Sequence, residues 1–104
     1  MGKLAFFLHF ILAVFPIDAT ENRRHIHVIY KGNKKKKTHR GNTVAKIWIE
    51  ENGQKKIEVD WSTLSVAEQG EIIEAVDANW DFIMKQIDEV FMGNKVKILT
   101  LHNK

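Results

Sequence analysis

His25 and His27 are the residues of this chain best suited to chemistry near neutral pH. They stand two apart in the string RHIHVIYK of residues 24–31, which alternates in polarity as a strand does. Side chains at positions i and i+2 of a strand point to the same side of a sheet. Lys46, Trp48 and Glu50 alternate in the same way in the string TVAKIWIE of residues 43–50. Strict alternation therefore predicts that all five side chains share one open sheet surface.

Acid–base cleavage of RNA is one chemistry that these residue types allow. Imidazoles titrate near neutral pH, so one of His25 and His27 can deprotonate a 2′-hydroxyl while the other protonates the leaving oxygen. Lys46 or Arg24 would stabilise the negative charge that develops around phosphorus. The predicted catalytic residues for this scheme are His25, His27 and Lys46, and the scheme needs no metal.

The same two histidines also have the spacing of two ligands of one metal. A complete site needs a third ligand, and only His9, Glu50 or His39 offers one. The plainer alternative is that two exposed histidines simply decorate a sheet. The pattern leaves metal binding open, and from the sequence we assign neither a metal nor a cofactor.

Binding of nucleic acid without chemistry is a third alternative. Trp48 on a sheet face can stack on bases, and neighbouring cations can hold phosphates, as in other single-strand binders. A run of lysines is also typical of a solvated loop, although it contributes a salt-dependent attraction to any polyanion. The cations expected to contribute are Arg23, Arg24, Lys34, Lys35, Lys36, Lys37 and Arg40.

Length and composition predict one globular domain over residues 1–104, with 44% apolar residues and no cysteine for disulfides or thiolate metal sites. Charge is distributed unevenly. Residues 1–46 hold ten Lys/Arg against two acids, a net charge of +8, whereas residues 47–104 hold six against eleven, a net charge of −5. This asymmetry indicates either a half that binds polyanions or two halves that dock on one another.

Three strands are expected after residue 23. Residues 24–31 form one, residues 43–50 the next, and residues 55–61 return from the turn at Asn52-Gly53, a sequence typical of a hairpin. A polar loop over residues 32–42 joins the first two. Alternation assigns one set of side chains to the core face: Ile26, Val28, Tyr30, Ala45, Ile47, Ile49, Ile57, Val59 and Trp61. It assigns another set to the opposite face: His25, His27, Lys46, Trp48, Glu50, Lys56, Glu58 and Asp60.

The periodicity then becomes helical. Spacings of three and four residues define an apolar stripe over Ile73, Val76, Trp80, Ile83, Ile87 and Val90. Ser65 and Glu68 have the spacing of a capping box at its start, and Gly93 is placed to end it. Gly70 and residues 77–79 are points where this helix can bend or divide. Residues 95–101 are expected to add a short final strand.

The segment Leu4–Phe15, LAFFLHFILAVF, is the most apolar part of the chain. It is too short to span a bilayer, which takes about 20 apolar residues, so no membrane partner is expected. We predict a long buried strand, covered on one side by the core and on the other by a partner subunit or protein. The alternative is a secretory signal in residues 1–19 with cleavage after Ala19, which would make the protein secreted or periplasmic instead of cytoplasmic.

Two strings resemble a small bacterial family, the domain of unknown function catalogued as forty-one sixty, especially its forms from Bacteroides-like bacteria. They are His25-Ile26-His27-Val28 and Val44–Glu50, followed by Leu64-Ser65 and an acidic amphipathic helix. The resemblance covers nearly the whole chain in the same order. The family's His-x-His-Val and Ala-Lys strands map onto His25, His27 and Lys46. Many members lead into the first with Asp/Asn-His-Pro-Pro, where this chain has Thr20–Arg24, so a role of that missing histidine does not carry over.

The resemblance implies a cytoplasmic protein with a cognate partner in a toxin–antitoxin-like pair, and it brings no assigned activity. The expected fold is α+β, an antiparallel sheet of four to five strands packed on one face by a long C-terminal helix, whole or broken in two. The main functional hypothesis is an interaction module for nucleic acid or a cognate protein. A metal-independent ribonuclease-like toxin using His25 and His27, and an oligomerising domain without a site, are the alternatives, so enzymatic activity stays open.

Overall fold

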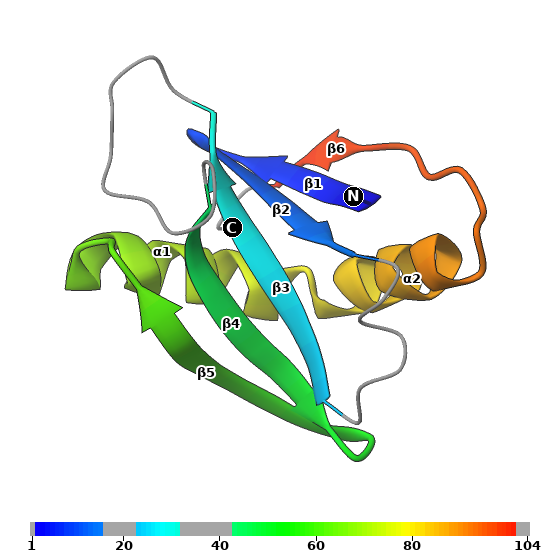
Figure 1. Cartoon of the computed structure of the whole chain (residues 1–104), viewed down its shortest axis with the longest axis horizontal. Coiled ribbons are helices and arrows are strands. Elements are labelled where there is room, and N and C mark those ends of the chain that lie inside the picture. The colour runs from blue at the N-terminus through cyan, green and yellow to red at the C-terminus, as the bar shows by residue number, and fades with distance from the viewer. Residues whose placement is uncertain (1, 16–22, 32–42, 102–104) are drawn as a thin grey trace.

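The computed structural model describes residues 2–15, 23–31 and 43–101, which form an α+β fold with one sheet and two helices (Figure 1). The sheet has six strands in the order β5-β4-β3-β2-β1-β6. All neighbouring strands run antiparallel except β1 and β6, so the sheet is mixed. The predicted α+β class is confirmed, whereas the prediction of a purely antiparallel sheet of four to five strands was wrong.

The extra strand comes from the N-terminal apolar run, which is a hairpin and not one long strand. β1 (Gly2–Phe7) pairs with β2 (Phe10–Val14) across a two-residue turn at Leu8 and His9. Leu8 has a φ of 52°, in the left-handed region that such turns require. Leu is seldom found there, so the sequence carried no turn signal. Of this segment, Leu4, Ala5, Phe7, Phe10, Leu12, Ala13 and Val14 are all buried within this chain.

β3 (Arg23–Tyr30), β4 (Thr43–Glu51) and β5 (Gln54–Ser62) form the antiparallel half that the sequence predicted, with Asn52 and Gly53 both at positive φ in the turn. Their register is interrupted by bulges. Relative to β3, β4 carries an extra residue at Val44 and another at Ile49. Relative to β4, β5 carries an extra residue at Asp60 and another between Lys55 and Glu58. Each bulge shifts which side chains share a face.

Two helices follow, divided at Asn79. α1 (Val66–Ala78) begins with the expected capping box, in which the Ser65 hydroxyl accepts from the Glu68 backbone N–H. α2 (Trp80–Phe91) ends where Gly93 takes a φ of 79° and the N–H groups of residues 93 and 94 donate to the carbonyls of Val90 and Glu89. The C-terminal segment then adds β6 (Leu99–Thr100), parallel to β1.

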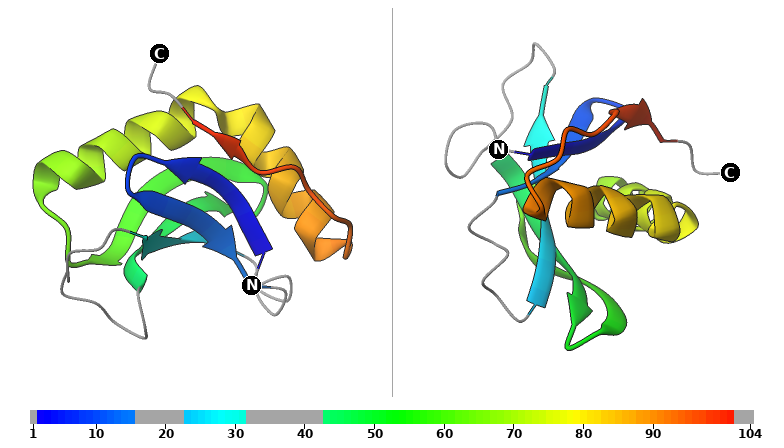
Figure 2. Two further views of the ribbon diagram at one scale, coloured as in Figure 1. Left: turned by 90° about the horizontal axis from the view of Figure 1, so that it is seen from above. Right: turned by 90° about the vertical axis from the view of Figure 1, so that its right-hand side faces the viewer.

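Both helices lie on one face of the sheet; in Figure 1, β3 and β4 pass in front of α1, and α2 lies to the right of β3. The right-hand view of Figure 2 places the helices to one side of these strands. The core between the layers holds Ile26, Val28 and Ile47 from the sheet, and Ile72, Ala75, Val76, Ile83 and Ile87 from the helices. Ile72 is fully buried, and the expected Ile73 only half-buried, so the stripe starts one residue earlier than predicted.

Two side chains lie on the opposite face from the one that alternation predicted. The bulge at Ile49 places Glu50 on the helix side, where it pairs with Arg24, which in turn reaches Asp88 of α2. The bulge at Asp60 makes Trp61 the cross-strand partner of Lys46, on the side away from the helices. Among residues 2–15, 23–31 and 43–101, no helix has the length and apolar character needed to cross a membrane.

Candidate functional site

His25 and His27 project together from β3 on the sheet face opposite the helices, hereafter the helix-free face. Their Nε2 atoms are 3.2 Å apart, and their ring centroids 4.9 Å apart at an interplanar angle of 69°. An N···N distance of 3.2 Å fits a hydrogen bond in which one imidazole donates and the other accepts. The predicted sharing of one face by the two imidazoles is therefore present.

Neighbouring strands surround this pair with aromatic rings. His25 lies opposite Trp48 in the register of β3 and β4, and their ring centroids are 4.7 Å apart in an edge-to-face arrangement. Phe15, just after β2, makes a similar contact with His27, at 4.5 Å. Lys46 lies opposite His27, and its ammonium group sits over the Trp48 ring, 4.7 Å from the centroid. The five side chains form one cluster, hereafter the histidine cluster: Phe15, His25, His27, Lys46 and Trp48.

The histidine cluster is less open than alternation alone predicted. His25 is only 2% exposed, while His27, Lys46 and Trp48 are half-buried. The rings of His27 and Trp48 flank the His25 imidazole on its own face of the sheet, and this packing accounts for part of its burial. The accessible part of the cluster therefore consists of His27, Lys46, Trp48 and Phe15.

This geometry bears on the acid–base scheme. A general acid and a general base must lie on opposite sides of the phosphate, one at the attacking and one at the leaving oxygen. Here the two Nε2 atoms are in contact with one another, which leaves no room for a phosphate between them. His25 is also too buried to meet a polynucleotide. The arrangement fits mutual orientation of the rings better than in-line cleavage.

Among the predicted cations, Arg24 does not join the histidine cluster. Arg24 lies on the helix side, with its Nε 3.2 Å from Glu50 Oε1 and its Nη1 2.5 Å from Asp88 Oδ1. Arg23 belongs to β3 and pairs with Glu51 through the register, but its side chain falls outside the described residues. Outside them as well are Lys34, Lys35, Lys36, Lys37, His39 and Arg40.

Several residues of the helix-free face were not assigned to it from the sequence, among them Phe6, Phe15, Lys31 and Trp61. Phe15 and Phe6 were assigned to one long strand, and Trp61 to the core, because neither the first hairpin nor the bulge at Asp60 leaves a clear signal. Lys31, two residues beyond Ile29 on β3, holds its ammonium group 4.3 Å from the centroid of the Phe6 ring. The helix-free face therefore carries a second contact of a lysine with an aromatic ring.

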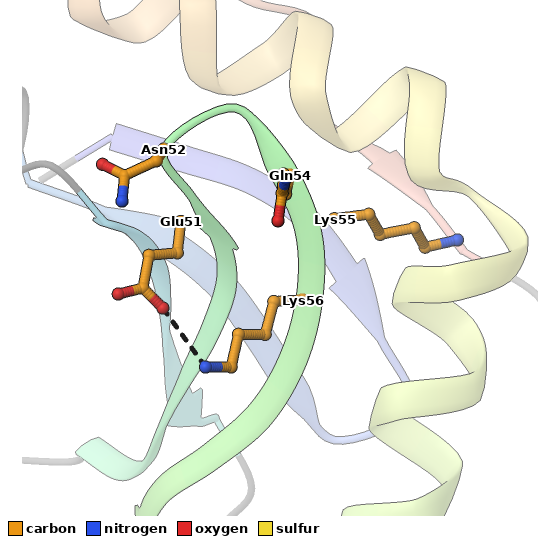
Figure 3. A pocket seen from close by; sticks show the side chains of 5 residues that line it. All are labelled: Glu51, Asn52, Gln54, Lys55 and Lys56. Carbon is orange, nitrogen blue, oxygen red and sulfur yellow. Dashed lines mark hydrogen bonds and ion pairs between the residues drawn. The ribbon is translucent and has the colours of Figure 1, made fainter.

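A hollow of about 300 Å³ lies at the tip of the β4–β5 hairpin, lined by Glu51, Asn52, Gln54, Lys55 and Lys56 (Figure 3). Its charges are satisfied locally. Lys56 Nζ is 3.2 Å from Glu51 Oε2, and Figure 3 shows the Lys55 side chain directed away from Glu51 and Lys56. Lys55 instead pairs with Asp77 of α1. The hollow therefore holds no convergent unpaired charge for a ligand.

Searches of protein-family models, curated proteins and solved structures found no match to this chain.

Proposed function

We propose that this protein is a non-enzymatic binding module that holds single-stranded nucleic acid on the helix-free face of its sheet. One observation carries the proposal: Lys46 and Lys31 each hold an ammonium group over an aromatic ring of this face, Trp48 and Phe6 respectively. Single-strand binders combine these two elements, since an aromatic ring stacks on bases of any sequence and a cation attracts the phosphates.

The charge pairing on the two faces supports this choice. On the helix side, carboxylates neutralise the cations: Arg24 pairs with Glu50 and Asp88, and Lys55 with Asp77. On the helix-free face, Lys56 pairs with Glu51 and Glu58, whereas Lys46 and Lys31 form no ion pair with a carboxylate of the described residues. An ammonium group held over a ring and lacking an acidic partner retains its attraction for a polyanion. The net charge of +8 in residues 1–46 adds a long-range attraction of the same sign.

The test is binding of a fluorescently labelled single-stranded oligoribonucleotide, followed by anisotropy at several salt concentrations. Trp48→Leu should weaken binding about tenfold, because loss of stacking on one base costs about 1–3 kcal/mol. Lys46→Met should weaken binding to all RNA sequences about equally. It should also reduce the slope of log affinity against log salt concentration by about 1. Equal binding by the wild type and both variants would contradict the proposal.

Lys55→Met is the matched control. Lys55 also holds its ammonium group over an indole, 4.8 Å from the centroid of Trp80, but it lies on the helix side and pairs with Asp77. Its loss should leave RNA binding unchanged. If Lys55→Met weakens binding as much as Lys46→Met does, the nucleic acid is not held on the helix-free face.

The same samples distinguish the ribonuclease alternative. RNA run on a denaturing gel after incubation should stay intact. Cleavage that persists in chelator and disappears in His27→Ala would replace this proposal with the acid–base scheme. If the RNA stays intact and no binding is measured either, a cognate protein or an oligomerising role is favoured instead.

The proposal includes a cytoplasmic location and a cognate protein partner, as the family resemblance implies. Residues 2–14 support the location, because they form two interior strands of the sheet, which signal cleavage would remove. Seven residues of Leu4–Phe15 are buried in the chain's own core. Only the remaining residues of this segment are available for contact with a partner protein or a second copy of the chain. Elution from a calibrated gel-filtration column at micromolar concentration checks this contact.

A further inference from the structure

The two Nε2 atoms of His25 and His27 have the separation of two donor atoms on one metal ion. Zinc binds imidazole nitrogen at about 2.0–2.1 Å. With bonds of this length, the two nitrogens lie about 2.9 Å apart when the nitrogen–zinc–nitrogen angle is 90° and about 3.4 Å apart when it is tetrahedral. The observed separation is 3.2 Å, between these limits.

The surrounding rings hold the imidazoles in this orientation. Trp48 meets His25 edge to face at 68°, and Phe15 meets His27 at 75°. His25 is 2% exposed, so its ring has little freedom to turn away. A pair of ligands that is already oriented loses less conformational freedom when the ion binds.

We propose that His25 and His27 form a binding site for one divalent transition-metal ion, coordinated through the two Nε2 atoms. When the ion enters, it lies beside the line that joins the two nitrogens. The ring that donated the hydrogen bond changes tautomer, its proton moving from Nε2 to Nδ1 by exchange with solvent, so that both Nε2 lone pairs bind the ion. Imidazole ligands suit Zn²⁺, Ni²⁺ and Cu²⁺, with Cu²⁺ held most tightly. The site is independent of the proposed nucleic-acid binding, because it uses the imidazoles and not Lys46 or the face of Trp48.

The chain supplies two ligands from the described residues, which contain no cluster of three or more His, Cys, Asp or Glu side chains arranged for a metal. Water then takes the remaining coordination positions. Affinity should accordingly be moderate, below that of a closed structural zinc site with four protein ligands. Entry is from the side of His27, which is half-buried, and not from that of His25.

The experiment uses a background variant of the full chain in which the other three histidines are replaced: His9→Asn, His39→Asn and His102→Asn. Isothermal titration with NiCl₂ or ZnCl₂ alone should give one ion per chain, with the same affinity as the wild type. Adding His27→Asn should weaken binding by at least about tenfold, since even the loss of an outer-shell partner costs about 10–100-fold.

The far-UV circular dichroism of each variant must match that of the wild type, so that loss of binding reports the ligand and not the fold. A second readout avoids calorimetry. Cu²⁺ should quench tryptophan fluorescence in the background variant, because the Trp48 ring lies 4.7 Å from that of His25, and His27→Asn should remove this quenching. Loss of binding in the background variant, or no effect of His27→Asn, overturns the site. Absence of binding at millimolar metal also overturns it and leaves the pair as a hydrogen bond.

Discussion

Gln86 of α2 is the buried polar side chain that ties the two ends of the chain together. Its Nε2 donates to the carbonyl of Leu4 in β1, at 3.0 Å, and to that of Lys97 in the C-terminal segment, at 2.8 Å. Leu4 is itself fully buried, so its carbonyl has little access to water. Because a buried acceptor left without a donor costs stability, this one amide contributes more than its exposed counterparts.

We expect Gln86→Leu to lower the free energy of unfolding by about 2 kcal/mol, since an unsatisfied buried carbonyl costs about 1–3 kcal/mol. Urea unfolding followed by circular dichroism measures the change. Gln54→Leu, at an exposed position of β5, is the control and should change stability by less than about 0.5 kcal/mol. Equal effects of the two substitutions would show that the amide is not an anchor.

The alternation of residues along each strand predicted part of the set of side chains on the helix-free face. Alternation placed His25, His27, Lys46 and Trp48 together correctly, because the register between Trp48 and Ala45 runs without interruption along β3. It failed for Glu50 and Trp61, each of which follows a bulge. A bulge depends on cross-strand partners and so leaves no mark in one strand's own pattern. The burial of His25 was missed for a related reason, because aromatic neighbours supply it.

At the scale of elements, the sequence predicted the ends of helices and strands correctly where residues typical of turns or helix caps occur. Asn52-Gly53 predicted the β4–β5 hairpin, Ser65 and Glu68 the start of α1, and Gly93 the end of α2. The β1–β2 hairpin was missed because its turn is made by Leu8 and His9. Leu8 adopts a left-handed φ of 52° although it is neither Gly nor Asn, and it is 54% exposed. Tertiary packing of the two apolar strands overrides local preference here.

Leu8 gives a direct test of that hairpin. A left-handed conformation costs a non-glycine residue about 1–2 kcal/mol, so Leu8→Gly should raise the free energy of unfolding by about 0.5–1 kcal/mol after allowance for the flexibility of glycine. Leu8→Ala keeps the Cβ atom and should give no such gain. Thermal or urea unfolding of the two variants compares them directly. A glycine variant no more stable than the alanine variant would contradict the turn at this position.

At the scale of the whole molecule, both strands of the N-terminal hairpin are interior strands of the sheet. β1 and β2 lie between β6 and β3, so they join the C-terminal strand to the other three. Gly2 packs so closely on Val90 that an added Cβ would lie 2.3 Å from its side chain. The halves of opposite charge also meet, since Arg24 of β3 pairs with Asp88 of α2. Docking between the halves thus uses some of the positive charge, while Lys31 and Lys46 remain on the helix-free face.

A chain that begins at Thr20, as signal cleavage would leave it, should therefore lose cooperative unfolding. It lacks the buried side chains of both strands, and β3 and β6 would each lose a neighbour. Circular dichroism during a urea titration measures this, with the full chain as the reference. Mass spectrometry of the protein recovered from its native cells should find residues 2–19 retained in the mature chain. A stable, cooperatively folded product starting at Thr20 would support the secretory alternative.

The location of the bound nucleic acid is the claim on which the functional account depends, and the three tryptophans report it. Trp48 and Trp61 lie on the helix-free face, whereas Trp80 begins α2 and packs on the core from the other side. Indole N–H signals in an NMR spectrum of ¹⁵N-labelled protein, titrated with a single-stranded oligoribonucleotide, distinguish the two faces. If RNA binds the helix-free face, the Trp48 signal should shift and saturate, less strongly at high salt, while the Trp80 signal should stay in place. A shift confined to Trp80, or no shift of Trp48 at saturating RNA, would contradict binding on this face.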